Sequence, residues 1–188
     1  MKKQIILASA SPRRISLLKE MGITFKVIPS QIKESTHFIK PSCIVRDLAY
    51  QKGINISKVY PNSIVLSADT IVVLNKKIVG KPKNMKESNQ IIRELNGSFH
   101  KVYTGVFIID NVSNKQICFY DCAKVKMKKL SEQELGKFFG KNMDKAGGYA
   151  VQDTNDSFVD KVYGDYYTVV GLPIKKLKKE LKHFNICF

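Results

Sequence analysis

The chain has 188 residues, of which 44% are hydrophobic and 26% charged, an ordinary globular composition. No window approaches the apolarity of a membrane span, so no transmembrane helix is expected. The formal net charge of +16 makes nucleic acid, acidic lipid surfaces and phosphorylated small molecules the candidate partners. The lysines are spread through nearly every segment, which weakens the case for nucleic acid, and we expect one domain over residues 1–188.

The first elements in the chain are a buried strand over residues 4–8 and a helix that follows at once. Ser11 is a good N-cap, Pro12 suits the first helical position, and Gly22 predicts the end of the helix. These signals place the strand-to-helix turn at residues 9–11.

Arg13 and Arg14 lie in the first turn of this helix, where a cation faces the positive end of the helix dipole. That arrangement costs about 0.3–1 kcal/mol per charge. An anion bound at the free backbone N–H groups reverses the sign, and the small residues at 8–11 leave room for it. The turn therefore predicts a phosphate-like ligand, with a solvated basic turn as the alternative.

Strands and helices alternate through the rest of the chain. We expect an extended piece at 23–30, a polar loop from 31, a helix over 41–56 with a cap at Ser42, and a strand over 63–74 that turns through a hairpin into 78–80. A helix over 85–96, capped by Asn84, precedes two antiparallel strands over 98–110 and 116–130. The chain then continues with a short helix from 131, an irregular segment at 140–153, further strands, and a helix over 172–184. The last helix is apolar on one face and basic on the other, which favours packing on the core over binding to a membrane or nucleic acid.

Three clusters carry residues suited to chemistry. Asp69 interrupts a run of β-branched residues, and because an unpaired buried carboxylate is costly it predicts either a reactive group at a strand end or a turn cap. Lys81 stands between a glycine and a proline, which would hold its ammonium in a defined place. The glycine pair at 147–148 allows close approach to a ligand, and Gln152 offers a donor and an acceptor to a base; the alternative is a glycine-rich loop that leads into a strand.

The cysteines give no sign of a metal knuckle. Cys118 and Cys122 share one face of an expected strand, which favours buried or half-buried thiols over disulfides or metal ligands; the other two cysteines are Cys43 and Cys187. The N-terminal apolar run is too short for a signal peptide, so a cytoplasmic location is expected.

Six motifs occur in one order over nearly the whole chain: LASASPRR, SADTIVV, GKP, VYTGV, DKAGGYAVQ and YTVVGLP. Together they resemble the Maf family of nucleotide pyrophosphatases. The resemblance implies an α/β fold with an elongated mixed sheet flanked by helices, similar to inosine triphosphate pyrophosphatases, with the site in a cleft between two lobes. It also implies hydrolysis of a nucleoside triphosphate to the monophosphate and pyrophosphate, aided by a divalent cation, magnesium or manganese.

The resemblance assigns roles to particular residues. Asp69 matches the family's catalytic acidic residue, and Glu34 its acidic position after the second strand. Arg13, Lys52 and Lys81 match its phosphate-binding residues. The site expected in full has catalytic Asp69, Lys81, Lys52 and Arg13, substrate-binding Ser9, Arg13, Arg14, Thr70 and Gln152, and metal-binding Glu34 and Asp69.

Two branches of the family differ at the base site. This chain is similar to the branch that acts on thymidine and uridine triphosphates, because it has Arg13 after Ser-Pro, Thr70 after the aspartate, and Gln152. It departs from the family at Asp153, where glycine is usual, which bears on the substrate range. Dimers are common in similar proteins, so a homodimer is an expected partner. The alternatives are a nucleotide-binding regulator of cell division and a basic nucleic-acid-binding protein; for the latter, no exposed aromatic platform is evident.

Overall fold

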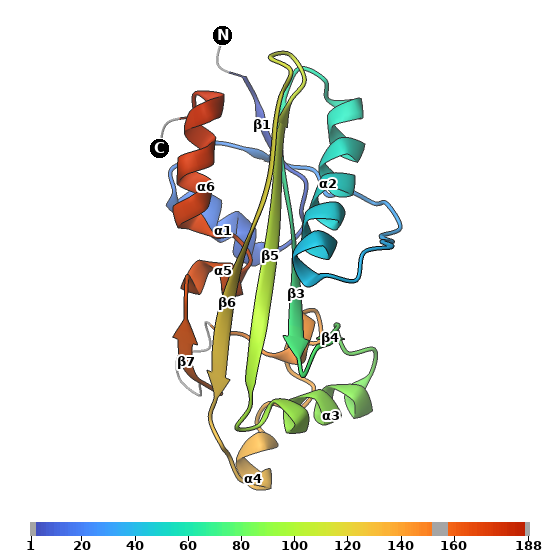
Figure 1. Ribbon diagram of the computed structural model, residues 1–188, viewed down its shortest axis with the longest axis vertical. Helices are drawn as coiled ribbons and strands as arrows, with labels where there is room; N and C mark the ends of the chain where they lie inside the picture. Colours follow the sequence, from blue (N-terminus) through green and yellow to red (C-terminus); the bar gives the residue numbers. More distant parts are fainter. Residues whose placement is uncertain (1–2, 152–157, 187–188) are drawn as a thin grey trace. The chain divides into compact units, whose positions relative to one another are not determined.

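The computed structural model describes residues 3–151 and 158–186 (Figure 1). Its elements are β1 (Ile5–Leu7), α1 (Pro12–Glu20), β2 (Lys26–Val27), α2 (Pro41–Val59), β3 (Ile64–Leu74), β4 (Lys77–Val79), α3 (Met85–Leu95), β5 (Phe99–Asp110), β6 (Lys115–Met127), α4 (Glu132–Leu135), β7 (Val159–Tyr163), α5 (Tyr166–Val170) and α6 (Ile174–Leu181). Two short 3-10 turns lie at Ala146–Gly148 and Lys182–Phe184. Gln152 and Asp153 lie outside the described residues.

The strands form one mixed sheet in the order β2-β1-β3-β5-β6-β7, with β4 paired to β3. β1 runs parallel to both β2 and β3, whereas β4 pairs antiparallel with β3 and β7 with β6. Parallel pairs need crossover connections, which α1 and α2 supply between the first three strands. The expectation of an α/β fold with a mixed sheet and flanking helices is confirmed.

The chain divides into two compact units. The first unit comprises Met1–Asp69, Thr104–Asp121 and Gly171–Phe188, and the second comprises Thr70–Tyr103 and Cys122–Val170. In β3 the boundary falls between Asp69 and Thr70.

The core of the first unit lies on both faces of its strands. Side chains alternate along a strand, so Ile6 and Val65 pack with Ala49 and Ile56 of α2 while their neighbours in sequence face the other way. In Figure 1, α2 lies on one side of β1 and β3, and α1 and α6 lie on the other. β1 and the first half of β3 are therefore buried on both faces, as the IIL and IVL runs require, whereas β2 at the edge of the sheet is exposed.

The second unit has its own core around α3. Ile92 and Leu95 of this helix pack with Val72, Val102 and Val125 of the sheet. Asn84 caps α3 as expected, because its side-chain oxygen accepts a hydrogen bond from the Glu87 amide at 2.9 Å.

Two sequence-based expectations for the elements are wrong. α2 extends to Val59 rather than ending near residue 56, and it begins after Lys40, with Ser42 buried in its first turn instead of capping it. Tyr166–Val170 forms a short helix where a strand was expected, so β7 is the one strand that follows residue 140 in the described part of the chain.

Candidate functional site

The turn between β1 and α1 has the features of an anion-binding helix N-terminus. Pro12 occupies the first turn of α1, no acidic residue lies in that turn, and the Ser11 side chain makes no capping hydrogen bond. The Ser11 amide instead donates to Ser9 Oγ at 3.3 Å. The turn thus combines the positive end of a helix dipole with Arg13 and Arg14, the combination that favours a phosphate.

Arg14 ties this turn to two distant segments. Its Nη1 donates to Ser9 Oγ at 3.0 Å and to the carbonyl of Ala68 at 2.9 Å, and its Nε donates to the carbonyl of Gly171 at 3.0 Å. Burial lowers the pKa of the guanidinium, while Asp69 acts in the opposite direction. Arg14 therefore fixes the turn against the middle of β3, directly before Asp69. The expectation that Asp69 stands at a strand end or caps a turn is wrong, because β3 continues to Leu74.

Lys52, Glu34 and Asp69 form a charged cluster beside that point. The Lys52 Nζ lies 2.6 Å from Asp69 Oδ1 and 2.9 Å from Glu34 Oε1. The Lys52 and Asp69 side chains are only 14% and 12% exposed, whereas Glu34 is 44% exposed. The Lys52–Asp69 ion pair is thus largely shielded from water, and Glu34 is the member of the cluster that is exposed to solvent.

The fold explains why Asp69 points at Lys52. Val65, Ser67 and Asp69 alternate onto the same face of β3, and on that face Ser67 Oγ donates to the carbonyl of Ala49 in α2 at 2.6 Å. One turn further along α2, Lys52 reaches the same face. The segment between β2 and α2 brings Glu34 to the same ammonium.

The carboxylates of Glu34 and Asp69 suit a hard divalent cation. Mg²⁺ is commonly held by one or two carboxylates, with phosphate oxygens and water completing its shell. Both carboxylates contact one ammonium, so they are close enough to share a cation with a bound triphosphate. Within residues 3–151 and 158–186, no cluster of three or more acidic, histidine or cysteine side chains suits a metal, so the rest of the shell would come from the substrate and water.

The remaining expected site residues belong to the second unit. Thr70 is half-buried and, as the next residue after Asp69 in β3, alternates to the opposite face of the strand. Lys81 is exposed in the turn after β4. The two glycine motifs meet there, because the Gly147 amide donates to the carbonyl of Gly80 at 3.1 Å, with Gly147 at φ 77°. Gln152, which is expected to contact the base, lies outside the described residues.

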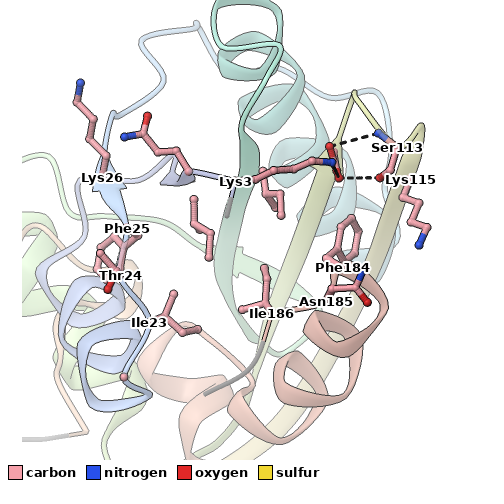
Figure 2. A pocket seen from close by; sticks show the side chains of 15 residues that line it. Lys3, Ile23, Thr24, Phe25, Lys26, Ser113, Lys115, Phe184, Asn185 and Ile186 are labelled. Atoms are coloured by element: carbon pink, nitrogen blue, oxygen red, sulfur yellow. Dashed lines mark hydrogen bonds and ion pairs between the residues drawn. The ribbon is translucent and has the colours of Figure 1, made fainter. Parts of the chain in front are cut away.

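A cavity of about 700 Å³ lies elsewhere in the first unit (Figure 2). Ile23, Phe25, Phe184 and Ile186 line it, together with the ion pair of Lys3 and Asp110. None of the expected site residues lines this cavity, so its volume carries no information about the phosphate site.

Two further observations concern residues that the sequence did not single out for function. His100 and Tyr149, buried in the second unit, form a hydrogen bond of 2.6 Å between Nε2 and the hydroxyl, and burial lowers the pKa of His100 to about 4.

The two cysteines of β6 differ in exposure. Cys118 is exposed and Cys122 half-buried, so the expectation of a buried or half-buried thiol is wrong for Cys118.

A basic helix N-terminus beside a carboxylate on a central strand of an α/β sheet is typical of the class of phosphate-binding α/β proteins. Residues 4–184 match the model of the Maf-like protein family, and the chain belongs to that family. It is 41% identical to a dTTP/UTP pyrophosphatase of Elusimicrobium minutum over 97% of this chain and 99% of that one. It is 43% identical to a dTTP/UTP pyrophosphatase of Bacillus cereus over 98% and 91%.

A solved structure supports the fold. The Staphylococcus aureus Ham1 protein aligns with a TM-score of 0.58 at 13% identity, covering 96% of this chain and 99% of that one. Identity this low speaks for a shared fold alone. Within the described residues, no helix combines the length and apolarity that crossing a membrane requires.

Proposed function

We propose that this protein hydrolyses dTTP and UTP to the nucleoside monophosphate and pyrophosphate. The observation that carries the proposal is the cluster of Lys52, Glu34 and Asp69, held beside the basic β1–α1 turn by the hydrogen bonds of Arg14. The cluster combines the cation, the acidic group and the anion site that cleavage of a triphosphate requires.

The β1–α1 turn and its neighbours bind the triphosphate. The N–H groups in the first turn of α1 and the Arg13 guanidinium donate hydrogen bonds to phosphate oxygens, and the Lys52 ammonium neutralises part of the phosphates' charge. Lys81 of the GKP turn adds a further cation to the phosphates. Arg14, whose donors already reach Ser9, Ala68 and Gly171, keeps the turn in the geometry that the phosphates need.

Asp69 orients the water that attacks the α phosphorus. The Lys52 Nζ lies 2.6 Å from Asp69 Oδ1 and holds the carboxylate in a fixed direction, so that it can accept a hydrogen bond from the attacking water. A bound Mg²⁺ or Mn²⁺, held by Glu34 and Asp69, would supply charge neutralisation and lower the pKa of a coordinated water.

Thr70 and Gln152 recognise the pyrimidine. A site that hydrogen-bonds a base edge rejects a wrong base strongly, because the protein's polar groups are then left without partners. The dTTP/UTP pyrophosphatases at 41–43% identity support this substrate pair, as does the likeness of this chain to the pyrimidine branch at Arg13, Thr70 and Gln152.

The test is hydrolysis of each ribo- and deoxyribonucleoside triphosphate with Mg²⁺ or Mn²⁺, with the products separated by chromatography. UTP and dTTP should give the monophosphate and pyrophosphate in equal amounts, at a kcat/KM roughly 10⁴-fold above that for ATP or GTP. Release of orthophosphate and a nucleoside diphosphate would refute the bond assignment. Equal rates with purine triphosphates would refute the base assignment.

A further inference from the structure

An exposed face of the sheet in the second unit combines two aromatic rings with several lysines. Side chains of β5, β6 and β7 that alternate away from the core form this surface, which we call the aromatic–lysine face: Phe99, Lys101, Lys124, Lys126, Lys161 and Tyr163. Their neighbours on the opposite face, such as Val102 and Val125, are buried in the core. The three strands lie in consecutive order in the sheet (Figure 1).

The two rings are held in place and remain open to solvent, so the expectation that the chain has no exposed aromatic platform is wrong. The centroids of Phe99 and Tyr163 lie 6.4 Å apart, and each ring is part of a residue that is 44% exposed. Lys124 lies opposite Tyr163 in the strand register, and its Nζ is 4.2 Å from the Phe99 centroid. The Lys161 Nζ is 5.2 Å from the Tyr163 centroid. The cation–π contacts therefore order both rings and both ammonium groups together.

We propose that the aromatic–lysine face binds single-stranded nucleic acid. Exposed rings stack with bases whatever their identity, and neighbouring lysines attract the phosphates between them. A duplex fits less well, because its bases are already stacked on one another. Four lysines stand against one acidic neighbour, Asp160, which pairs with Lys126 at 2.7 Å, so the face is complementary to a polyanion.

The same charges disfavour a second copy of this chain as the partner. In a two-fold dimer the face would meet itself, and lysines would be opposed to lysines. The proposal is independent of the triphosphate site, whose charged cluster lies in the first unit.

The test measures binding of a short fluorescently labelled single strand of mixed sequence by anisotropy, with a duplex of the same sequence for comparison. The wild type should prefer the single strand. Phe99→Ala with Tyr163→Ala should weaken binding at least about 10-fold, and Phe99→Trp with Tyr163→Trp should retain it. Hydrolysis of UTP, measured on the same samples, should stay unchanged, which keeps this proposal separate from the proposed function.

A matched pair of charge reversals separates a local site from general charge. Lys124→Glu with Lys161→Glu changes the face, whereas Lys175→Glu with Lys179→Glu changes exposed positions on α6 by the same charge. Only the first pair should weaken binding strongly and flatten its salt dependence. Equal losses from both pairs, or wild-type binding by the double alanine variant, would overturn the proposal. So would concentration-dependent self-association that the double alanine variant abolishes, since the face would then be a dimer interface.

Discussion

Arg14 explains why two arginines occur where a helix dipole disfavours them. Its three hydrogen bonds to Ser9, Ala68 and Gly171 join the first helix to the middle of β3 and to the segment before α6. Arg13 is the neighbouring cation and is the one proposed to face the phosphates. The basic first turn thus divides into one residue that positions the site and one that binds.

Arg14→Lys should separate these roles. A lysine keeps the charge but replaces the planar set of donors by a single ammonium, so the turn loses its fixed contacts to both Ala68 and Gly171. We expect kcat for UTP to fall about 10- to 100-fold with a smaller change in KM, because the turn loses its fixed position relative to Asp69 while the positive charge at residue 14 is kept. Arg13→Lys is the control and should mainly raise KM. Equal kinetic effects of the two variants would argue against this division.

The buried pair of His100 and Tyr149 makes stability depend on pH. The pKa of His100 is about 4 in the fold and 6.5 in the unfolded chain, so between these values the unfolded state binds the proton first. The free energy of unfolding should therefore fall by about 3 kcal/mol from pH 6.5 to below 4 through this residue. His100→Gln, which keeps a hydrogen-bonding side chain but does not titrate, should show a shallower decline in urea unfolding over this range. An unchanged pH profile would contradict the assignment.

At the scale of elements, the close approach of α2 to the sheet holds Lys52 over Asp69. A Cβ atom on Gly53 would lie 2.4 Å from the Phe107 ring, and one on Gly105 would lie 2.3 Å from the backbone carbonyl of Val45. Neither glycine has a positive φ, so glycine is required at both positions because a side chain would not fit, and not because of an unusual backbone conformation.

Gly105→Ala should move α2 away from β5, because backbone atoms cannot give way as a flexible side chain can. We expect a loss of about 1–3 kcal/mol in the free energy of unfolding, accompanied by lower kcat for UTP. Gly80→Ala is the matched control, since a Cβ there has nothing within 4 Å. If both variants unfold at the same urea concentration, the close-packing argument fails.

The elements that could be predicted are those with a local cause. Pro12 and Asn84 begin helices through their own backbone and side-chain chemistry, and the turn at Asn75 and Lys76 has both residues at positive φ, as a tight hairpin requires. α2 continues through Gly53 because of packing on Phe107, which lies far away in the sequence. No local pattern signals such a contact.

The candidate site divides in the same way. Asp69 and the basic turn could be found from the residues alone, because a carboxylate in an apolar run and arginines at a helix N-terminus both need partners. Lys52 and Glu34 carry no such signal and were assigned by resemblance; the structure then joins them to Asp69. The acceptors of Arg14 are backbone carbonyls, which no sequence pattern reveals.

At the scale of the whole molecule, the net charge of +16 acts on any anionic substrate before contact is made. A positive field raises the association rate of a triphosphate, and salt screens it over about 8 Å at physiological ionic strength. The charge thus affects capture rather than the bond-breaking step.

The kcat/KM for UTP should therefore fall several-fold as monovalent salt rises from about 0.05 to 0.3 M, while kcat changes little. The double variant Lys175→Glu, Lys179→Glu should show a flatter dependence, because its field is weaker. The unfolding midpoint, followed in the same buffers, controls for effects of salt on the fold. A salt effect confined to kcat would place the charge effect in the chemical step instead.

The most direct measurement is pyrophosphate release from UTP by Asp69→Asn. This variant keeps the size of the side chain and removes its charge, and Asp121→Asn is the control, since Asp121 also pairs with a lysine at 2.6 Å in the same unit. We predict at least about a 100-fold loss of kcat for Asp69→Asn, with UTP binding still detectable by calorimetry, and near-normal turnover for Asp121→Asn. Turnover by Asp69→Asn within a few-fold of the wild type would contradict the account.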